Sequence, residues 1–397
     1  MITLVLLAQA VATPASLWAG PPAQSLEVGE PSPANEAAPG SSLPIGPQAD
    51  GLVFTLAGDG TQSAAEINGP PLSVPMTDPM GVTAVTLAVG EQTHSVALVS
   101  SAAVDRVHGI HPLVAGGGTV ARSFPHLIEG EPYDIAFDHE TFNAPEGWVY
   151  IVTRLGHSVV RLPSAPGTPP PPQLIAGGTQ GPASDGPVPG AEATFNQPHD
   201  LCLDGRGGLL VADTKNHVIR RIDLDDPTFP VSVWGRQELD GQSLRGPRVI
   251  VRDTAATNAG GFVVAYREAN RLVQLDADGR VTAVLAGTGT RGNTGDGGPA
   301  IEATLGGPKG LAVAEDGDLY FADTENHTVR YVDRQTGRIE TLIGDGKKGD
   351  GPDGTARECR LSRPHGVALL GSLLLIADTG NHRLRAVDVT IARQLAE

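Results

Sequence analysis

The sequence is poor in cysteine, in aromatic residues and in positive charge, and each shortage narrows the class of protein. Two cysteines, Cys202 and Cys359, occur in 397 residues, too few for a disulfide-stapled scaffold. Aromatic residues make up 4 % and charged residues 18 % of the chain, a composition that favours short strands joined by turns over long helices. The net charge of −17 argues against nucleic acid as a partner, because binding a phosphate backbone requires clustered Lys and Arg.

A long apolar run is also missing. The run at residues 2–12 is too short to span a bilayer as a helix, but it has the length of a signal-peptide core and small residues follow it. No Lys or Arg precedes Arg106, so the usual positive charge before that core is absent. We expect residues 1–20 to be a signal peptide, which places the protein outside the cytoplasm, in the periplasm or secreted. A misassigned start codon or a disordered tail is the alternative.

Residues 21–50 contain mainly Pro, Ala, Gly and Ser, with few large apolar side chains. Such a segment cannot bury enough surface to fold, so we expect a disordered linker there. The folded domain is therefore expected to span residues 51–397. The chain as a whole has 51 Gly and 33 Pro, which is typical of many short strands joined by turns.

The most informative feature that is present is a phrase of the form Asp-Thr-x-Asn-His, which occurs three times. Its copies begin at Asp213, Asp323 and Asp378. The steps between them are 323 − 213 = 110 and 378 − 323 = 55, so the period is 55 residues with one degenerate copy between the first two. Self-similarity at a regular period of this order indicates a solenoid, a propeller or another repeat array.

The repeat unit reads as four short antiparallel strands. In the copy that runs from residue 308 to residue 344, apolar segments at 310–314, 318–322, 327–332 and 338–343 alternate with polar or Gly-containing turns, as in one propeller blade. Six such units begin after Pro79, Pro132, Pro198, Pro247, Pro308 and Pro364. The last unit has only three strands, and residues 52–58 match the missing fourth. We therefore predict an all-β, six-bladed β-propeller whose N-terminal strand completes the C-terminal blade.

The phrase Asp-x-x-Asn-His-x-(Val/Leu)-Arg resembles the NHL repeat. Three near-complete copies end at Arg220, Arg330 and Arg385. A copy at residues 267–274 keeps Asn270 but has Arg271 in place of His, and a copy at residues 154–161 keeps His157. The resemblance implies an NHL-type propeller. It leaves function open, because NHL propellers include protein- and RNA-binding platforms, sensor ectodomains and a few enzymes.

We expect the repeated polar residues to be structural. Each Asp and His is expected to brace its own blade by bonding to turn backbone and to the following Arg. The alternative is a metal site, since Asp and His are common ligands, but one copy in each blade favours the structural role. The residues concerned are Asp213, Asn216, His217, Asp323, Asn326, His327, Asp378, Asn381 and His382.

A stretch rich in Gly and Asp, residues 344–354, contains carboxylates that Ca²⁺ could use. It does not follow the spacing of an EF-hand loop and lacks the closing Glu. Lys347 and Lys348 within it also oppose a cation. We therefore expect an ordinary loop and predict no metal ion and no cofactor.

A sharper candidate site follows from the propeller geometry. The residue after each blade-opening Pro lies at the start of an innermost strand, beside the central channel. Around the ring these residues are Met80, Tyr133, His199, Arg248, Lys309 and His365. The last five make a cationic and aromatic ring on an acidic protein, so a carboxylate or other anionic ligand is expected there. A water-filled channel mouth lined by unrelated side chains is the alternative.

The Pro-His pairs at His199 and His365 resemble the zinc-ligand positions of peptidylglycine α-amidating lyase, another six-bladed propeller of NHL-like type. That resemblance implies three histidines on alternating blades around one zinc. Here each alternating set supplies only one histidine, and a catalytic zinc requires three protein ligands. No Gly-x-Ser-x-Gly, phosphate-binding loop or His-Glu-x-x-His motif is present either. No catalytic residue is therefore predicted.

We conclude from the sequence that the chain is an exported, non-catalytic binding platform. Long inter-blade segments, at residues 184–195, 287–305 and 351–361, should lie on the same face as the Asp-Thr-x-Asn-His turns. That face is expected to bind a protein, a peptide or a glycan-like ligand. A metal-dependent lyase or hydrolase with its site at the channel mouth is the alternative, and a purely structural spacer is a third possibility.

Overall fold

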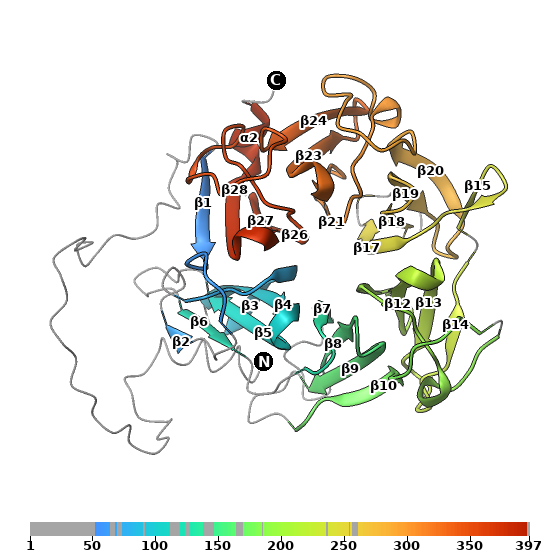
Figure 1. Ribbon diagram of the computed structural model, residues 1–397. Helices are drawn as coiled ribbons and strands as arrows, with labels where there is room; N and C mark the ends of the chain where they lie inside the picture. Colours follow the sequence, from blue (N-terminus) through green and yellow to red (C-terminus); the bar gives the residue numbers. More distant parts are fainter. Residues whose placement is uncertain are drawn as a thin grey trace, which may run out of the picture.

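The described residues of the computed structural model form six antiparallel sheets around a central channel (Figure 1), together with one short hairpin. The structure describes residues 52–394 apart from 64–67, 70–73, 90–91, 112–119, 124–127, 138–146, 164–169, 185, 236, 254 and 256–260. The expected signal peptide and linker, at residues 1–20 and 21–50, lie outside this part. The prediction of an all-β, six-bladed propeller is confirmed.

The first three blades contain the following strands, given from the channel outward. Blade 1 has β3 (Pro79–Val89), β4 (Gln92–Ser101), β5 (Arg106–His111), β6 (Val120–Ser123) and β2 (Asn68–Gly69). Blade 2 has β7 (Pro132–Phe137), β8 (Trp148–Thr153), β9 (Ser158–Pro163) and β10 (Gln173–Gly177). Blade 3 has β11 (Asp200–Leu203), β12 (Gly208–Asp213), β13 (Val218–Asp223) and β14 (Val231–Val233), and the hairpin of β15 (Glu238–Leu239) and β16 (Gln242–Ser243) follows it.

The last three blades have the same order. Blade 4 has β17 (Pro247–Asp253), β18 (Gly261–Tyr266), β19 (Arg271–Leu275) and β20 (Val281–Ala286). Blade 5 has β21 (Gly310–Val313), β22 (Leu319–Asp323), β23 (Thr328–Asp333) and β24 (Arg338–Ile343). Blade 6 has β26 (Val367–Leu370), β27 (Leu373–Asp378), β28 (Arg383–Asp388), β1 (Leu52–Ala57) and β25 (Gly354–Thr355), and α2 (Val389–Gln394) follows it.

Single 3-10 turns occupy two kinds of position in these blades. Those between the second and third strands are η2 (Ala102–Val104), η4 (Thr214–Asn216), η6 (Thr324–Asn326) and η7 (Thr379–Asn381). Those in the segments that join one blade to the next are η3 (Gly190–Glu192) and η5 (Ala300–Glu302). Both kinds lie on one face of the ring, because both follow strands that run in the same direction along the channel.

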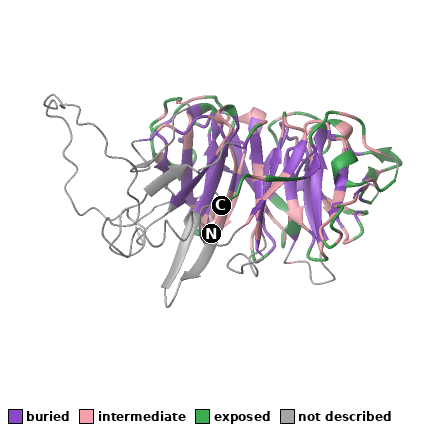
Figure 2. Cartoon of the chain, turned by 90° about the horizontal axis from the view of Figure 1, so that it is seen from below, coloured by how far each residue is buried: buried purple, intermediate pink, exposed green. Residues whose placement is uncertain are grey.

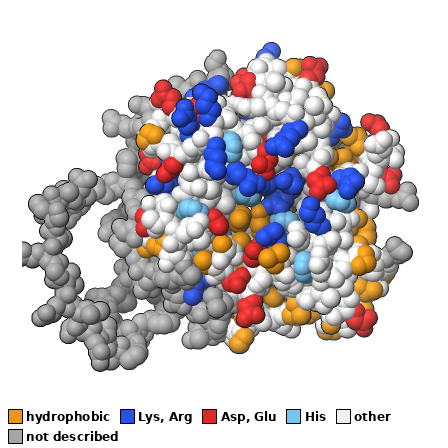
Figure 3. Space-filling view, in the orientation of Figure 1, with side chains coloured by type: hydrophobic (Ala, Val, Ile, Leu, Met, Phe, Trp, Pro, Cys, Tyr) orange, Lys and Arg blue, Asp and Glu red, His pale blue; other side chains and the backbone are white. Residues whose placement is uncertain are grey.

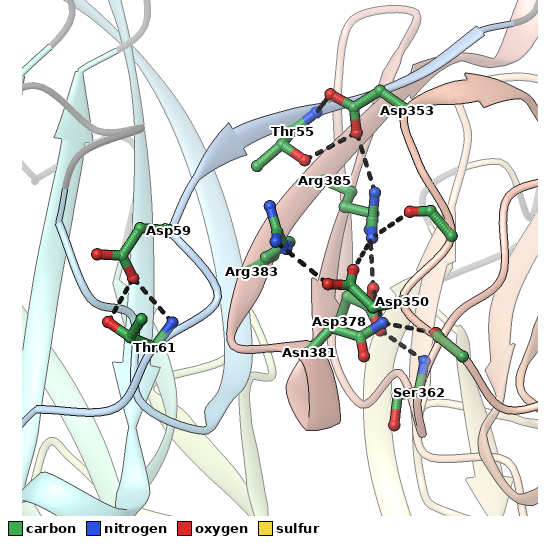
Figure 4. A network of polar contacts seen from close by, with 12 residues as sticks. Thr55, Asp59, Thr61, Asp350, Asp353, Ser362, Asp378, Asn381, Arg383 and Arg385 are labelled. Atoms are coloured by element: carbon green, nitrogen blue, oxygen red, sulfur yellow. Dashed lines mark hydrogen bonds and ion pairs between the residues drawn. The ribbon is translucent and has the colours of Figure 1, made fainter. Parts of the chain in front are cut away.

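The N-terminal strand closes the ring, as the sequence predicts. β1 pairs antiparallel with β28, with Thr55 opposite Arg385, and Asp353 fixes it in place (Figure 4). The backbone N–H and the hydroxyl of Thr55 both donate to the carboxylate of Asp353, at 2.9 and 2.8 Å. Pairing the two ends of the domain in one sheet removes two free strand edges, which are otherwise exposed to aggregation.

The hydrophobic core lies between neighbouring blades. Val263 and Ala265 of β18, for example, belong to one buried cluster with Leu311 of β21 and Phe321 of β22. Figure 2 shows the buried residues concentrated in the strands and the exposed residues in the loops of both faces. Since every blade packs on two neighbours, the innermost strands are held in a fixed ring around the channel. This ring positions the candidate site.

Candidate functional site

The repeated histidines connect neighbouring blades. His217, His327 and His382 each end a 3-10 turn in the left-handed conformation, with φ of 60°, 58° and 54°. The Nδ1 atom of each accepts a hydrogen bond from a backbone N–H in the segment that leads into the next blade, at 3.1–3.2 Å. The expectation that each His braces its own blade is wrong. Its side chain lies over the end of the turn and reaches across the blade boundary.

The same inter-blade bond occurs in all six blades, and we call it the clasp. In blades 1, 2 and 4 the left-handed residue is Asp105, His157 or Asn270, and its side chain accepts a backbone N–H at 2.7, 3.1 or 2.9 Å. The donors around the ring are Asp78, Glu131, Gln197, Gly246, Gly307 and Arg363, and all have positive φ as well. Asn270 therefore occupies the His position. The sequence alignment of residues 267–274, which equated it with the motif Asn, was one residue out of register.

The Asp and Asn of the motif connect each turn to the preceding inter-blade segment. Asp213 accepts the backbone N–H of Asn196 at 2.8 Å and the side-chain amide of Asn216 at 2.8 Å. Asn216 also donates to the carbonyl of Gly181 at 2.9 Å. The copies at Asp323 and Asp378 make the same bonds. The long segments and the motif turns therefore lie together, on what we call the loop face.

The motif arginines are buried and face carboxylates. Arg385 is 1 % exposed, and its guanidinium contacts Asp378, Asp353 and Asp350 at 2.7, 3.0 and 2.8 Å (Figure 4). Asp350 and Asp353 belong to the Gly- and Asp-rich stretch at residues 344–354, whose carboxylates were considered above as possible Ca²⁺ ligands. A guanidinium already occupies the position that a cation would take.

The six residues that follow the blade-opening prolines lie along one central cavity of about 1040 Å³. Tyr133, His199, Arg248, Lys309 and His365 are each 5–8 % exposed. They line the end of the cavity at the loop face, which we call the mouth. Figure 3 shows Lys and Arg side chains gathered around this opening, although the protein as a whole is acidic.

The mouth residues form two groups. In the first, a guanidinium N–H of Arg248 donates to the hydroxyl of Tyr133, its carbon lies 4.5 Å from the centre of that ring, and the ring meets His199 edge-on with centroids 4.7 Å apart. In the second, Lys309 Nζ lies 3.0 Å from His365 Nε2 and 3.2 Å from a carboxylate oxygen of Glu325. Each group joins residues of different blades.

Hydrogen bonding fixes the tautomers of both mouth histidines. Thr214 Oγ1 donates to the carbonyl of Pro247 at 2.8 Å, so it accepts from His199 Nδ1, also at 2.8 Å. Thr379 Oγ1 bonds the carbonyl of Pro79 in the same way and accepts from His365 Nδ1 at 2.9 Å. Burial lowers the pKa of both imidazoles well below the usual 6.5. Each ring is therefore neutral and carries its lone pair on Nε2.

Burial also shifts the cations of the mouth. It lowers the pKa of Arg248 to about 10, which leaves the guanidinium charged at neutral pH. Burial, together with the nearby charge of Arg248, lowers the pKa of Lys309 to about 6. Burial opposes ionisation of Glu325, yet the charges of Lys309 and Arg363 lower its pKa to about 2.

The loop-face side chains that surround the mouth, which we call the rim, include several Lys and Arg residues that form ion pairs with Glu. Arg154 bonds Glu131, Lys215 bonds Glu268, and Arg363 bonds Glu325. By contrast, no carboxylate forms an ion pair with Arg248 among the described residues. Arg267 and Arg154 disfavour its charge, and the carboxyl group of Asp200, deeper in the cavity, favours it without bonding to it.

Sequence reasoning missed a pair of carboxyl groups deeper in the cavity. Asp134 and Asp200 follow mouth residues of neighbouring blades, and their side chains hydrogen-bond to each other, so one of them carries a proton. Burial raises the pKa of Asp134 to about 6 and that of Asp200 well above its usual value. Asp200 also accepts the backbone N–H of Ile250 at 2.6 Å. The sequence does carry a signal for this pair: the position directly after each mouth residue is Asp in two blades and Gly in three.

Those glycines are required by close packing of the inner strands. A Cβ added at Gly310 would lie 2.1 Å from the carbonyl oxygen of His365, and one at Gly366 would lie 2.5 Å from that of Met80. Where Asp replaces Gly, the carboxyl group bonds the neighbouring inner strand. Asp134 and Asp200 therefore have a structural role at the channel wall.

The mouth does not fit a catalytic zinc site. Within the described part of the chain, no three His, Cys, Asp or Glu side chains converge as metal ligands. The Nε2 atom of His365 accepts from Lys309, so a metal ion at that nitrogen would have to displace an amine. Among the residues that the structure describes, the mouth therefore lacks the three-ligand set that a catalytic zinc requires.

Comparison with known proteins supports the resemblance to NHL repeats. The family model of the NHL repeat matches residues 195–222, and that of the Teneurin NHL domain matches residues 266–350. The chain is 28 % identical over 280 residues to the Arabidopsis thaliana protein SUPPRESSOR OF QUENCHING 1, chloroplastic, covering 64 % of the chain and 26 % of that protein. It is 28 % identical over 244 residues to human NHL repeat-containing protein 2, covering 51 % of the chain and 33 % of that protein. The chain thus spans a third or less of the length of these relatives.

Solved structures share the fold at low sequence identity. A protein of unknown function from Bacteroides thetaiotaomicron superposes with a TM-score of 0.62 at 18 % identity, covering 85 % of this chain and 75 % of that one. An auxiliary nutrient binding protein from Bacteroides ovatus superposes with a TM-score of 0.61 at 15 % identity, covering 85 % and 76 %. In the described residues, no helix is both long and apolar enough to cross a membrane.

Proposed function

Because the chain is an NHL-repeat β-propeller, we propose that it is a binding module whose loop face captures a partner through a carboxylate or similar anionic group held at the mouth. One observation carries this proposal. Arg248 is 6 % exposed and charged, yet no described carboxylate pairs with it. A buried unpaired charge is costly, and an anionic ligand in the cavity would remove that cost.

The surroundings of Arg248 suit such a ligand. The hydroxyl of Tyr133 holds one guanidinium N–H, which fixes the orientation of the fork that binds a carboxylate. Lys309 lines the same cavity and adds a second donor. The long inter-blade segments surround the mouth, so a partner larger than the cavity would also contact them. We propose an acidic peptide, an acidic protein terminus or an acidic glycan as that partner.

We further propose that the propeller works outside the cytoplasm as a non-catalytic platform. The apolar residues 2–12, followed by small residues, support export. Expression of the full chain in a bacterial host, followed by cell fractionation and N-terminal sequencing, tests this part. A mature chain that begins near residue 20 in the extracytoplasmic fraction supports export, and an intact chain in the cytoplasm contradicts it.

Calorimetric titration of the full chain tests the binding proposal. The probe is an acidic peptide with a free C-terminal carboxylate, compared with the same peptide amidated at its C-terminus, and with succinate as a small acid. Arg248→Gln should weaken binding of the free acid by about tenfold or more, since a charge-assisted hydrogen bond in a desolvated site is lost. Arg280→Gln is the control, because Arg280 is 67 % exposed and directly precedes β20, on the face opposite the mouth.

The outcomes separate the possibilities. Loss of binding in Arg248→Gln but not in Arg280→Gln supports the mouth as the site. Equal losses in both variants would indicate a diffuse charge effect and contradict it. Binding of the free-acid peptide to the wild type, without measurable binding of succinate, would favour a macromolecular partner over a small acid.

A further inference from the structure

Lys309 differs from the other amines of the loop face in how it is held. Its side chain is 4 % exposed and lines the central cavity. Its Nζ atom has two hydrogen-bond partners among the described residues, His365 Nε2 at 3.0 Å and a carboxylate oxygen of Glu325 at 3.2 Å. Lys215, on the rim, is 43 % exposed and pairs with Glu268.

Both partners of Lys309 are acceptors. The Nδ1–H of His365 is used by Thr379, so Nε2 can only accept, and Glu325 is ionised. A neutral amine that donates one N–H to each acceptor keeps its lone pair in the remaining tetrahedral direction. Burial and the adjacent charge of Arg248 lower the pKa of Lys309 to about 6. Most of the amine is therefore unprotonated at neutral pH, which is how lysines become nucleophilic beside a second cation.

We propose that Lys309 is a carbonyl-capturing amine that forms an imine with 2-oxo carboxylates whose carboxylate group is held by Arg248. The inference rests on the proposed function of the mouth and names a ligand class for it. A 2-oxo acid carries its carbonyl carbon directly beside the carboxylate. Arg248 and Lys309 follow the opening prolines of adjacent blades and line the same cavity, so the mouth offers both groups to a ligand that carries a carboxylate and a carbonyl side by side.

The chemistry needs no further reactant. The lone pair of Nζ attacks the carbonyl carbon, a C–N bond forms, and the carbonyl π pair moves onto oxygen. The proton that Nζ loses passes to His365 Nε2 and then to that oxygen. Departure of the hydroxyl group as water, with loss of the second Nζ proton, leaves a C=N bond. The balance is amine plus carbonyl giving imine plus water, with no change of oxidation state.

Borohydride trapping of the full chain with pyruvate at neutral pH tests this inference. The expected result is one reduced pyruvate adduct per chain, located on Lys309 by peptide mass spectrometry. Lys309→Arg keeps a hydrogen-bond donor at this position but removes the nucleophilic amine and should reduce the adduct by about tenfold or more, whereas Lys215→Arg should leave it unchanged. Adducts spread over exposed lysines, or an undiminished adduct in Lys309→Arg, would overturn the proposal.

Two further probes separate this inference from the binding proposal. Lactate has the carboxylate of pyruvate but no carbonyl, and its affinity is measured by calorimetry. If lactate binds in an Arg248-dependent manner while pyruvate leaves no adduct on Lys309, the mouth binds carboxylates and the imine inference fails. Acetaldehyde has a carbonyl but no carboxylate. If trapping occurs at Lys309, and Arg248→Gln reduces trapping of pyruvate but not of acetaldehyde, the binding proposal and the imine inference are both supported. If neither lactate nor pyruvate binds, both fail for this class of ligand.

Discussion

Arginine side chains are buried in two regions of this propeller, and their surroundings differ. In blades 3, 5 and 6 the motif arginines are 0–1 % exposed, and each faces the motif Asp of its own blade. At the mouth, Arg248 is buried almost as deeply, but its guanidinium bonds a phenol and forms no ion pair with a described carboxylate, Asp200 acting on it only at longer range. A paired buried cation serves the fold, because its charge is satisfied within the chain. An unpaired one suggests that something else supplies the negative charge.

The largest expected effect comes from breaking a motif pair. Asp378→Ala would leave Arg385, Asn381 and the backbone N–H of Ser362 without the carboxylate that all three contact. Arg385 keeps the more exposed carboxylates of Asp350 and Asp353, but three buried donors lose an acceptor at once, so we expect a loss of about 3–5 kcal/mol of unfolding free energy. Denaturant unfolding followed by circular dichroism measures it. A loss below about 1 kcal/mol would contradict the structural role of the motif.

The corresponding change at the mouth should behave in the opposite way. Arg248→Met removes a buried charge that has no acid partner, so the free energy of unfolding should stay within about 1 kcal/mol of the wild type or rise. The same denaturation experiment compares the two variants directly. If Arg248→Met destabilises the protein as much as Asp378→Ala, Arg248 is a structural residue and the contrast between the two regions fails.

An intermediate effect is expected at the clasp. His327→Ala leaves the backbone N–H of Arg363 without its acceptor, at a cost of about 1–2 kcal/mol. His327→Asn should cost less, since Asn270 makes the same bond in blade 4 from the same left-handed conformation. Thermal unfolding of both variants checks the order. An Asn variant as unstable as the Ala variant would show that the imidazole ring contributes more than its acceptor atom.

The smallest effect is a dependence on pH. Burial lowers the pKa of His217 below the usual 6.5 in the folded chain, assisted by Arg245 and Lys215 and opposed by Glu268. The unfolded chain therefore binds the proton first. The contribution of this histidine is fully present above pH 6.5 and is lost as the pH falls through the folded pKa.

His217→Asn isolates that contribution, because Asn does not titrate. Between neutral pH and pH 5, the unfolding free energy of the wild type should fall more than that of the variant. Comparing the two cancels the opposite contribution of the buried carboxyl groups, whose pKa values burial raises. Equal slopes for the two proteins would contradict the assignment of His217 as a neutral acceptor.

Much of the fold could be predicted from the sequence, because a propeller repeats one unit. The period of the Asp-Thr-x-Asn-His phrase located the blades, the prolines located the inner strands, and the match of residues 52–58 to a fourth strand gave the closure. The clasp could not be predicted in full. It requires only an acceptor atom on a left-handed residue, so Asp105 and Asn270 serve as well as His, and a search for identical letters misaligns them.

The candidate site was predictable in position but not in its contacts. Counting one residue beyond each opening Pro located the mouth side chains, since every blade places its inner strand in the same way. Which of them touch depends on side-chain reach across the channel. The contacts of Arg248 with Tyr133, and of Lys309 with His365, join residues far apart in sequence and on different blades. No periodic pattern encodes them.

Whether Arg248 marks an anion site is tested by measuring the free energy of unfolding of the wild type, Arg248→Gln and Arg280→Gln with and without succinate. A ligand that binds only the folded chain stabilises it in proportion to its occupancy. We expect succinate to stabilise the wild type and Arg280→Gln alike and to leave Arg248→Gln unchanged. Equal stabilisation of Arg248→Gln would show that the anion binds elsewhere and that the unpaired guanidinium does not mark the site.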